Sequence, residues 1–257
     1  MKPVNDLALA IEGLSLTFRG IRAIDELDCS IPRGAILGIV GPNGAGKTSV
    51  LNCISGFYRP QPGRIMFNGC DITHTPTHRR AALGIARTFQ NVEIYSGMTV
   101  VDVILSGRHL HMRSNLLTAG LFVGPCRREE IQNREEVERL MDFLELGPYR
   151  RAVAGTLPAG IQKRVSLGRA LAMNPTLLLL DEVTSGMSVE EKRDMARFIG
   201  EVRAEHGTTI LLVEHDLSFV VGIAERALVM DYGRKIAEGL PEEVLRRPEV
   251  VAAYVGE

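Results

Sequence analysis

The chain has 257 residues, of which 45% are hydrophobic and 24% charged, and a formal net charge of -1 at pH 7. These values are typical of a globular protein with one large domain, and the near balance of 30 basic and 31 acidic residues does not favour nucleic-acid binding. The apolar runs are too short to cross a bilayer, and the first residues lack the layout of a signal peptide. We therefore expect a cytoplasmic protein whose scattered cysteines, Cys29, Cys53, Cys70 and Cys126, are free thiols.

Two strands are predicted at the start of the chain. Alternation over Leu7 to Phe18 places Leu14, Leu16 and Phe18 on one face, and a second strand follows from Ala23 to Ile31. A further short strand, Arg64 to Phe67, precedes Asn68-Gly69, which is a strong hairpin signal. These segments predict an antiparallel β region on both sides of the segment described next.

A glycine-rich loop follows the apolar run Ala35 to Val40. It reads Gly41-Pro42-Asn43-Gly44-Ala45-Gly46-Lys47-Thr48-Ser49, and a helix is predicted to begin near Gly46 and to end near Ser55-Gly56. The spacing G-x-x-x-x-G-K-T is that of a phosphate-binding loop, whose backbone N–H groups and helix N-terminus surround phosphate oxygens. Lys47 is predicted to reach the β- and γ-phosphates and Thr48 to ligate Mg²⁺. The chain is therefore predicted to bind a nucleoside triphosphate through residues 41–49.

The middle of the chain is predicted to be helical. After a helix at Pro76 to Leu83 and a strand at Gly84 to Gln90, residues 91–155 show only helical patterns, at Thr99 to Arg108 and at Arg127 to Leu146. In the second helix one apolar face is predicted, together with two i,i+4 ion pairs. The face comprises Ile131, Val137, Leu140, Met141 and Leu144, and the pairs are Glu130–Arg134 and Glu135–Arg139.

Strands and helices alternate in the last hundred residues. Buried strands are predicted at Thr176 to Leu180 and Thr208 to Val213, and a hairpin around Tyr232-Gly233-Arg234. Helices are predicted at Pro158 to Met173, Val189 to Glu205 and Asp216 to Ala224, with two short ones near Pro241 and Pro248.

Two acidic residues follow the first of these buried strands. Asp181 ends the run of four leucines, and Glu182 comes next. An acidic residue at this place in a phosphate-loop protein can hold Mg²⁺, and its neighbour can orient or deprotonate a water. An acidic helix cap is the alternative interpretation of this pair.

The order of these features resembles the ATP-binding cassette of an ABC transporter, from Leu7 to the C-terminus. The resemblance implies an α/β fold: a P-loop NTPase with a mixed RecA-like core sheet, an antiparallel β subdomain and an inserted α-helical subdomain. It implies a single ABC ATPase domain over 1–257, with the core in 1–90 and 156–257 and the helical insert in 91–155.

The resemblance also implies roles for single residues. Phe18 matches an aromatic that stacks on adenine, although a core phenylalanine on the face of Leu14 and Leu16 is the alternative. Gln90 matches a glutamine that contacts Mg²⁺, His215 a histidine that contacts the γ-phosphate, and Ser185 to Ser188 a loop that crosses a dimer interface. The family's usual Leu-Ser-Gly-Gly-Gln is replaced by Leu157-Pro158-Ala159-Gly160-Ile161, followed by Gln162. Pro158, Gly160 and Gln162 are therefore expected to approach the nucleotide of a second cassette, with Pro158 at the first helical position.

The resemblance implies ATP and Mg²⁺ as cofactors and two cassettes that enclose two ATP molecules. The likeness is strongest to cassettes of branched-chain (hydrophobic) amino acid uptake systems, through 84–91, 56–60, 248–256 and the insert around 108–128. The expected partners are therefore permease subunits and a periplasmic or extracellular solute-binding protein, and no nucleic acid. The cassette is expected on the cytoplasmic face of the membrane. Asn91 to Met98 is the candidate surface for docking to the permease, and the alternative is that these residues fill the core of the helical subdomain. A urea, amide or lipid transporter, a soluble ABC ATPase acting on DNA or ribosomes, and a nucleotide-binding module with little hydrolysis remain alternatives.

Overall fold

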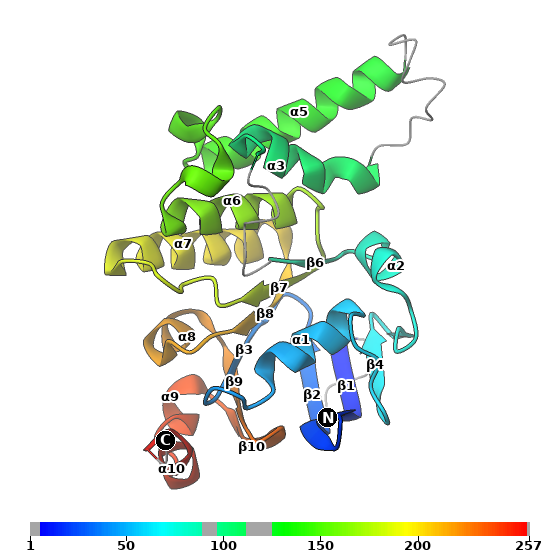
Figure 1. Cartoon of the computed structure of the whole chain (residues 1–257), viewed down its shortest axis with the longest axis vertical. Helices are drawn as coiled ribbons and strands as arrows, with labels where there is room; N and C mark the ends of the chain where they lie inside the picture. The colour runs from blue at the N-terminus through cyan, green and yellow to red at the C-terminus, as the bar shows by residue number, and fades with distance from the viewer. Residues whose placement is uncertain (1–5, 89–96, 112–124, 256–257) are drawn as a thin grey trace.

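The computed structural model describes residues 6–88, 97–111 and 125–255, without the side chains of 125–128. These residues form two β-sheets with helices around them (Figure 1). The strands are β1 (Leu7–Phe18), β2 (Ile21–Pro32), β3 (Ile36–Val40), β4 (Arg64–Phe67), β5 (Cys70–Asp71), β6 (Ile85–Arg87), β7 (Leu177–Asp181), β8 (Thr209–Val213), β9 (Arg226–Asp231) and β10 (Arg234–Gly239). The α-helices are α1 (Lys47–Ser55), α2 (Thr77–Ala82), α3 (Val100–Ser106), α5 (Pro125–Phe143), α6 (Ala159–Leu171), α7 (Val189–His206), α8 (Leu217–Ile223), α9 (Pro241–Val244) and α10 (Pro248–Val255), and the 3-10 helices are η3 (Gly107–His111), η4 (Gly147–Tyr149) and η5 (Ala154–Thr156).

The larger sheet is mixed, as the resemblance implies. Its order is β10-β9-β3-β8-β7-β6, and its neighbours are parallel except for the antiparallel pair of β9 and β10. Every residue of β3, β7 and β8 is buried. Short strands that consist almost wholly of Ile, Leu and Val form here because the sheet is covered on both faces.

Alternate side chains of the central strands point into two hydrophobic cores. In β3, Leu37 and Ile39 join the core that contains α1 and the smaller sheet, whereas Ile36 and Val40 join the core that contains α6, α7 and α8. The period-two alternation of a strand produces this division. The larger sheet is thus held between α1 on one face and α6 to α8 on the other.

The smaller sheet is antiparallel, with the order β2-β1-β4-β5. The predicted hairpin between β4 and β5 is present, because Asn68 and Gly69 both adopt positive φ and Phe67 pairs with Cys70. The predicted face of β1 is wrong at its end. Register shifts between β1 and β2 interrupt the alternation, so that Leu14 and Leu16 are buried while Phe18 is 41% exposed.

The described part of residues 91–155 is helical. Helices α3 and α5 pack on α6 at one end of the molecule (Figure 1), and an isolated bridge joins Thr99 to Val153. The domain boundaries at 90 and 155 remain predictions.

One detail of α5 differs from the sequence prediction. The predicted pair of Arg134 with Glu130 is present at 2.7 Å, but Arg139 pairs with Glu136 and not with Glu135. A residue on a helix is a neighbour of both the i−3 and the i−4 position, so sequence alone did not decide the partner. The predicted apolar face is also shorter than expected, because Ile131 is 45% exposed while Val137, Met141 and Leu144 are buried.

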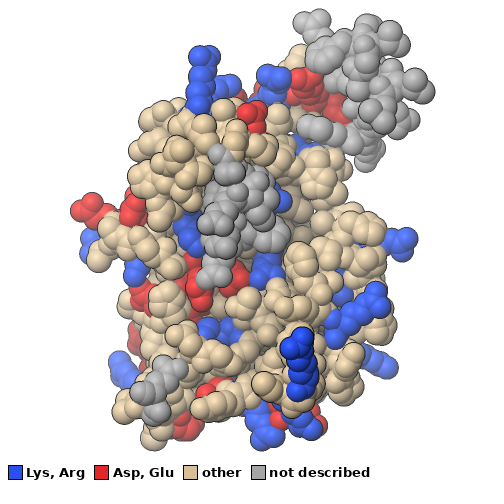
Figure 2. All heavy atoms as spheres, in the orientation of Figure 1, with Lys and Arg blue, Asp and Glu red and all other residues tan. Residues whose placement is uncertain are grey.

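Charged side chains of both signs are interspersed over the face of the molecule drawn in Figure 2. Among the described helices, none is both long enough and apolar enough to span a bilayer.

Candidate functional site

The candidate site lies where three neighbouring strands of the larger sheet end. Strands β3, β8 and β7 are adjacent and parallel, so their carboxyl ends meet at one edge. The glycine-rich loop follows β3, His215 comes after β8, and Asp181 and Glu182 come at the end of β7. A cavity of about 270 Å³ lies at this edge and is lined by Ala23, residues 43–49 and Glu182. The fold therefore brings together groups that lie far apart in the sequence, at the edge where open α/β sheets bind ligands.

The glycine-rich loop is packed tightly between β2 and β9. A Cβ atom at Gly46 would lie 2.2 Å from the carbonyl oxygen of Ala23, and one at Gly41 would lie 2.1 Å from that of Met230. Both glycines have positive φ. Larger residues are excluded here by space and by backbone conformation.

Lys47 begins α1 and is buried beneath the loop. Its Nζ donates hydrogen bonds to the carbonyl oxygens of Gly41 at 2.6 Å and Pro42 at 2.7 Å. The ammonium is therefore placed inside the curve of the loop. Thr48 and Ser49, the next residues of α1, line the cavity.

Asp181 is buried at the end of β7, with 3% exposure. Its Oδ2 accepts a hydrogen bond from Arg87 at 2.7 Å, and its backbone N–H donates to the Thr88 hydroxyl at 3.2 Å. Its Oδ1 is buried and has no hydrogen-bond partner among the described residues. Arg87 also donates to Asn52 on α1 at 2.7 Å, so it links the helix of the phosphate loop to this carboxylate.

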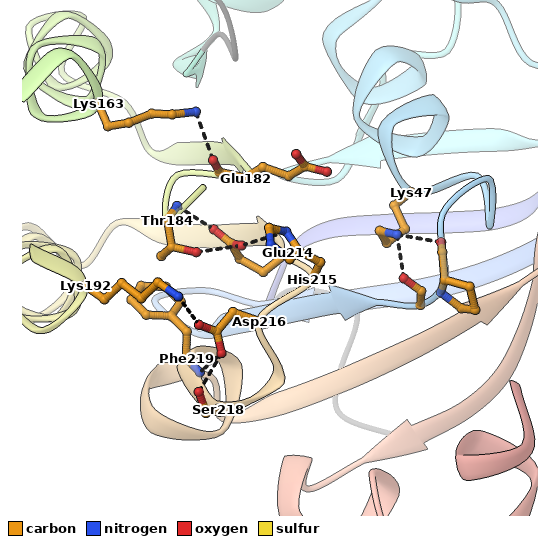
Figure 3. Close-up of polar contacts among 12 residues, drawn as sticks. Lys47, Lys163, Glu182, Thr184, Lys192, Glu214, His215, Asp216, Ser218 and Phe219 are labelled. Atoms are coloured by element: carbon orange, nitrogen blue, oxygen red, sulfur yellow. Dashed lines mark hydrogen bonds and ion pairs between the residues drawn. The ribbon is translucent and has the colours of Figure 1, made fainter. Parts of the chain in front are cut away.

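Glu182 lies just beyond β7 in a left-handed conformation, with φ of 46°. Its N–H donates to the carbonyl oxygen of Val213 at 2.9 Å, and its own carbonyl accepts from Lys163 Nζ at 3.0 Å. In Figure 3 its carboxylate extends away from Lys163, toward the side on which Lys47 lies. The Glu182 side chain therefore points to the loop cavity that it lines.

His215 is 54% exposed, and its Nδ1 lies 3.9 Å from Oε2 of the fully buried Glu214. The Glu214 carboxylate accepts hydrogen bonds from the N–H and the hydroxyl of Thr184, each at 2.9 Å. Burial raises the pKa of Glu214 and lowers the pKa of Lys163, the latter opposed by the nearby carboxylates of Glu214, Glu182 and Asp181.

Phe18 lies outside the lining of this cavity. Its ring packs edge-on against Tyr58, with 4.9 Å between centroids. Because it is 41% exposed, it is not the core phenylalanine that the sequence left as an alternative. Contact with adenine remains a prediction.

The segment 157–162 begins α6 and lies apart from the cavity lining. The sequence predicted Pro158 at the first helical position, but Pro158 is the N-cap and α6 begins one residue later, at Ala159. A Cβ atom at Gly160 would lie 2.0 Å from Oε1 of Glu191, so a carboxylate of the same chain approaches this glycine. Gln162 turns back and donates to the carbonyl oxygen of Leu157 at 2.7 Å.

Two predicted elements fall outside the described residues. Gln90 lies there, as do residues 91–96 of the candidate docking surface.

Sequence reasoning missed three charged residues of the site: Arg87, Lys163 and Glu214. A polar residue directly after a buried strand was the signal that identified Asp181, and the same signal is present at Glu214 after β8. Arg87 and Lys163 carry no such signal, because their partners are distant in the sequence.

The comparisons with known proteins show which family the chain resembles. The profile of the family described as "ABC transporter" matches residues 24–185, and that of "Branched-chain amino acid ATP-binding cassette transporter" matches residues 234–257. The chain is 37% identical to the high-affinity branched-chain amino acid transport ATP-binding protein BraF of Pseudomonas aeruginosa, over 97% of this chain and 98% of that protein. It is 33% identical to LivG of Escherichia coli, with the same shares covered.

Solved structures show the same fold over almost the whole chain. The crystal structure of a nucleotide-free ATP-binding cassette from an ABC transporter matches with a TM-score of 0.86 and 32% identity, covering 98% of this chain and all of that one. The ADP conformation of the cassette MJ1267 matches with a TM-score of 0.85 and 32% identity, covering 98% of this chain and 99% of that one. The chain therefore belongs to the ABC transporter family, as an ATP-binding and ATP-hydrolysing cassette subunit.

Proposed function

We propose that this cassette hydrolyses MgATP and thereby drives the uptake of branched-chain amino acids. The assembly of the phosphate loop, Asp181, Glu182 and His215 at one edge of the sheet is the observation that carries the ATPase part. The solute is inferred from the relatives BraF and LivG and from the match at residues 234–257.

The phosphates are proposed to bind in the loop 41–49. The glycine-rich backbone presents N–H groups, α1 contributes its positive end, and Lys47 exchanges the two carbonyls that it contacts for β- and γ-phosphate oxygens. Phe18 is proposed to stack on adenine from the end of β1.

The residues present fit Mg²⁺. Asp181 Oδ1 is a buried carboxylate oxygen without a protein partner, and Thr48 offers a hydroxyl at the cavity. Mg²⁺ at nucleotide sites is bound by one or two protein oxygens together with phosphates, which agrees with the finding that the described residues contain no larger cluster of metal-ligating side chains. We propose that Thr48, Asp181 and Gln90 would hold the ion, which would neutralise charge on the β- and γ-phosphates.

Hydrolysis requires an activated water, and Glu182 is the proposed general base. Its carboxylate lines the cavity beside the phosphate loop. His215, which is exposed at the end of β8, is proposed to donate a hydrogen bond to the γ-phosphate. The carboxylate of the buried Glu214 lies 3.9 Å from Nδ1 of this ring.

A second cassette is proposed to complete the site. Pro158 and Ala159 at the start of α6 are exposed, and among the described residues none of 157–162 lines this chain's own cavity, so the exposed helix start can contact another molecule. Pro158, Gly160 and Gln162 would then face the nucleotide of the partner across the helix N-terminus. Permease subunits, a solute-binding protein and a position on the cytoplasmic face of the membrane complete the proposal.

Uptake by cells tests the function. In a strain that lacks this gene, uptake of radiolabelled leucine is expected to fall, and the wild-type gene but not Lys47→Ala is expected to restore it. Labelled urea serves as a second solute. A strain that loses urea uptake and keeps leucine uptake would contradict the solute and leave the ATPase assignment intact.

A further inference from the structure

The backbone of Glu182 adopts a conformation that a residue with a side chain rarely takes. Its φ is 46°, in the left-handed region. Such a conformation persists at a functional site only where the surrounding structure fixes it. The contacts around Glu182 therefore show what determines the direction of its carboxylate.

Three sets of contacts fix this stretch of backbone. The Glu182 N–H donates to the carbonyl oxygen of Val213 at 2.9 Å, and the Glu182 carbonyl accepts from Lys163 Nζ at 3.0 Å. Two residues later, Glu214 accepts from the Thr184 N–H and hydroxyl at 2.9 Å each (Figure 3). Two of the three sets depend on buried charged side chains, Lys163 and Glu214, for which the proposed chemistry has no use.

Lys163 is an unusual partner for a backbone carbonyl. It is 9% exposed, and burial of an ammonium is unfavourable unless its charge is compensated. The carboxylates of Glu214, Glu182 and Asp181 supply that compensation, yet Nζ donates its hydrogen bond to the backbone carbonyl of Glu182. The lysine is therefore placed where it sets backbone position.

Lys163 lies on α6, about one turn after the N-cap Pro158. It joins the helix that we propose to face a second cassette to the residue that we propose to activate water in this chain's own site. A shift of α6 would move Nζ and, with it, the peptide that carries the Glu182 side chain.

We propose that Lys163 is a positioning residue for ATP hydrolysis, which fixes the Glu182 backbone and makes the aim of its carboxylate depend on the position of α6. The inference rests on the proposed role of Glu182 as general base. The inference goes beyond that role because it names Lys163 as the residue through which the start of α6 affects hydrolysis in the same chain.

The first test is the Lys163→Met variant of the full-length protein. Misplacement of a reacting group by about 1 Å costs up to about 100-fold in rate, so we expect kcat to fall by about 10- to 100-fold. The affinity for a fluorescent ATP analogue should stay within about twofold, because the phosphate loop is not altered. Lys163→Arg, which keeps a long cationic donor, should retain most of the activity.

Lys235→Met is the matched control. Lys235 Nζ also donates to a backbone carbonyl, that of Asp28 at 2.8 Å, but on β10. Its kcat should equal that of the wild type. The proposal would be overturned by an equal fall of kcat in both variants, by a Lys163→Met protein with unchanged kcat and only a higher KM, or by a loss of activity that a lower melting temperature accounts for.

The double variant separates positioning from a general structural effect. In the Glu182→Gln protein the carboxylate is absent, so adding Lys163→Met should cause no further loss in single-turnover rate. Losses that multiply would show that Lys163 acts by another route. If Glu182→Gln alone retains wild-type turnover, the proposed base is wrong; if it is inactive while Lys163→Met is fully active, only the positioning role fails.

Thr184→Val provides a second variant on the other side of the same loop. It removes one hydroxyl contact to Glu214 and keeps the shape of the side chain. We expect the same result as for Lys163→Met, a lower kcat with unchanged nucleotide affinity. A wild-type kcat would show that the position of this backbone does not control hydrolysis.

Discussion

Two adjacent carboxylates at the end of β7 are held in different ways. Asp181 is buried, and Arg87 binds one of its oxygens while the other has no partner among the described residues. Glu182 instead lines the loop cavity. A fixed, buried carboxylate suits a metal ligand, and a carboxylate that reaches the cavity suits a base for water.

Replacing Glu182 by Gln should therefore lower turnover by about 100- to 10,000-fold, since it removes the general base. Binding of MgATP should be retained, because the phosphate loop is unchanged. Steady-state hydrolysis and titration with a fluorescent ATP analogue measure the two quantities. Glu205→Gln, an exposed change on α7, is the control, and a Glu182→Gln protein with more than a tenth of wild-type turnover would contradict the assignment.

Asp216 gives a prediction on pH. Hydrogen bonds from Lys192 at 2.6 Å and from Ser218 lower the pKa of Asp216 to about 2 from its usual 3.8. A carboxyl with a lowered pKa in the folded state stabilises the protein above pH 4 and loses that contribution as pH falls to about 2.

Asp216→Asn keeps a side-chain oxygen as the N-cap of α8 but removes the charge. Allowing for solvent screening, we expect it to lower the free energy of unfolding by about 1 kcal/mol at pH 7. Urea denaturation of both proteins should show this difference vanishing near pH 2. A difference that is independent of pH would show that the charge is not its source.

At the scale of elements, the start of α6 differs from the family's usual Leu-Ser-Gly-Gly-Gln. Pro158 caps the helix without a side-chain hydrogen bond. Pro158→Ser would supply a hydroxyl that caps the helix and reaches a partner's γ-phosphate. One neutral hydrogen bond contributes about 0.5–1.5 kcal/mol, so ATP-driven association should tighten by about 2- to 10-fold in the Glu182→Gln background. Sedimentation measures it, and weaker association would show that the proline is needed to start the helix.

Arg87 joins β6 to α1 and β7. Arg87→Leu leaves the buried Asp181 without its cation, and loss of one partner of a buried pair costs about 3–5 kcal/mol. Urea denaturation should show that loss. The control is Arg134→Leu, which breaks an exposed pair with Glu130 and should cost less than about 1 kcal/mol. Equal losses would mean that the Arg87 contact does not hold these elements together.

Elements with a strong local signal were predictable from the sequence. The apolar runs that became β3, β7 and β8, the phosphate loop and the Asn68-Gly69 turn all depend on neighbouring residues, and each is present. The face of Phe18 was not predictable, because register shifts between β1 and β2 depend on how the two strands pair. The contacts of Arg87 and Lys163 could not be predicted from the sequence pattern either, because each joins elements that only the tertiary fold brings together.

At the scale of the whole molecule, we propose that two parts of one copy face different nucleotides. The phosphate loop and Glu182 line the cavity, and residues 157–162 begin a helix outside that lining as far as the described residues show. A second cassette that places its own α6 over the cavity would add N–H groups and positive dipole to the γ-phosphate. Hydrolysis then removes the group that holds the two cassettes together.

Hydrogen exchange on the assembled transporter tests this shared site most directly. With the Glu182→Gln cassette and MgATP, amides of residues 157–164 should become strongly protected relative to the complex with ADP, together with the phosphate loop 41–49. Protection of the loop alone, with 157–164 exchanging equally in both complexes, would show that one cassette encloses its nucleotide by itself and would contradict the account.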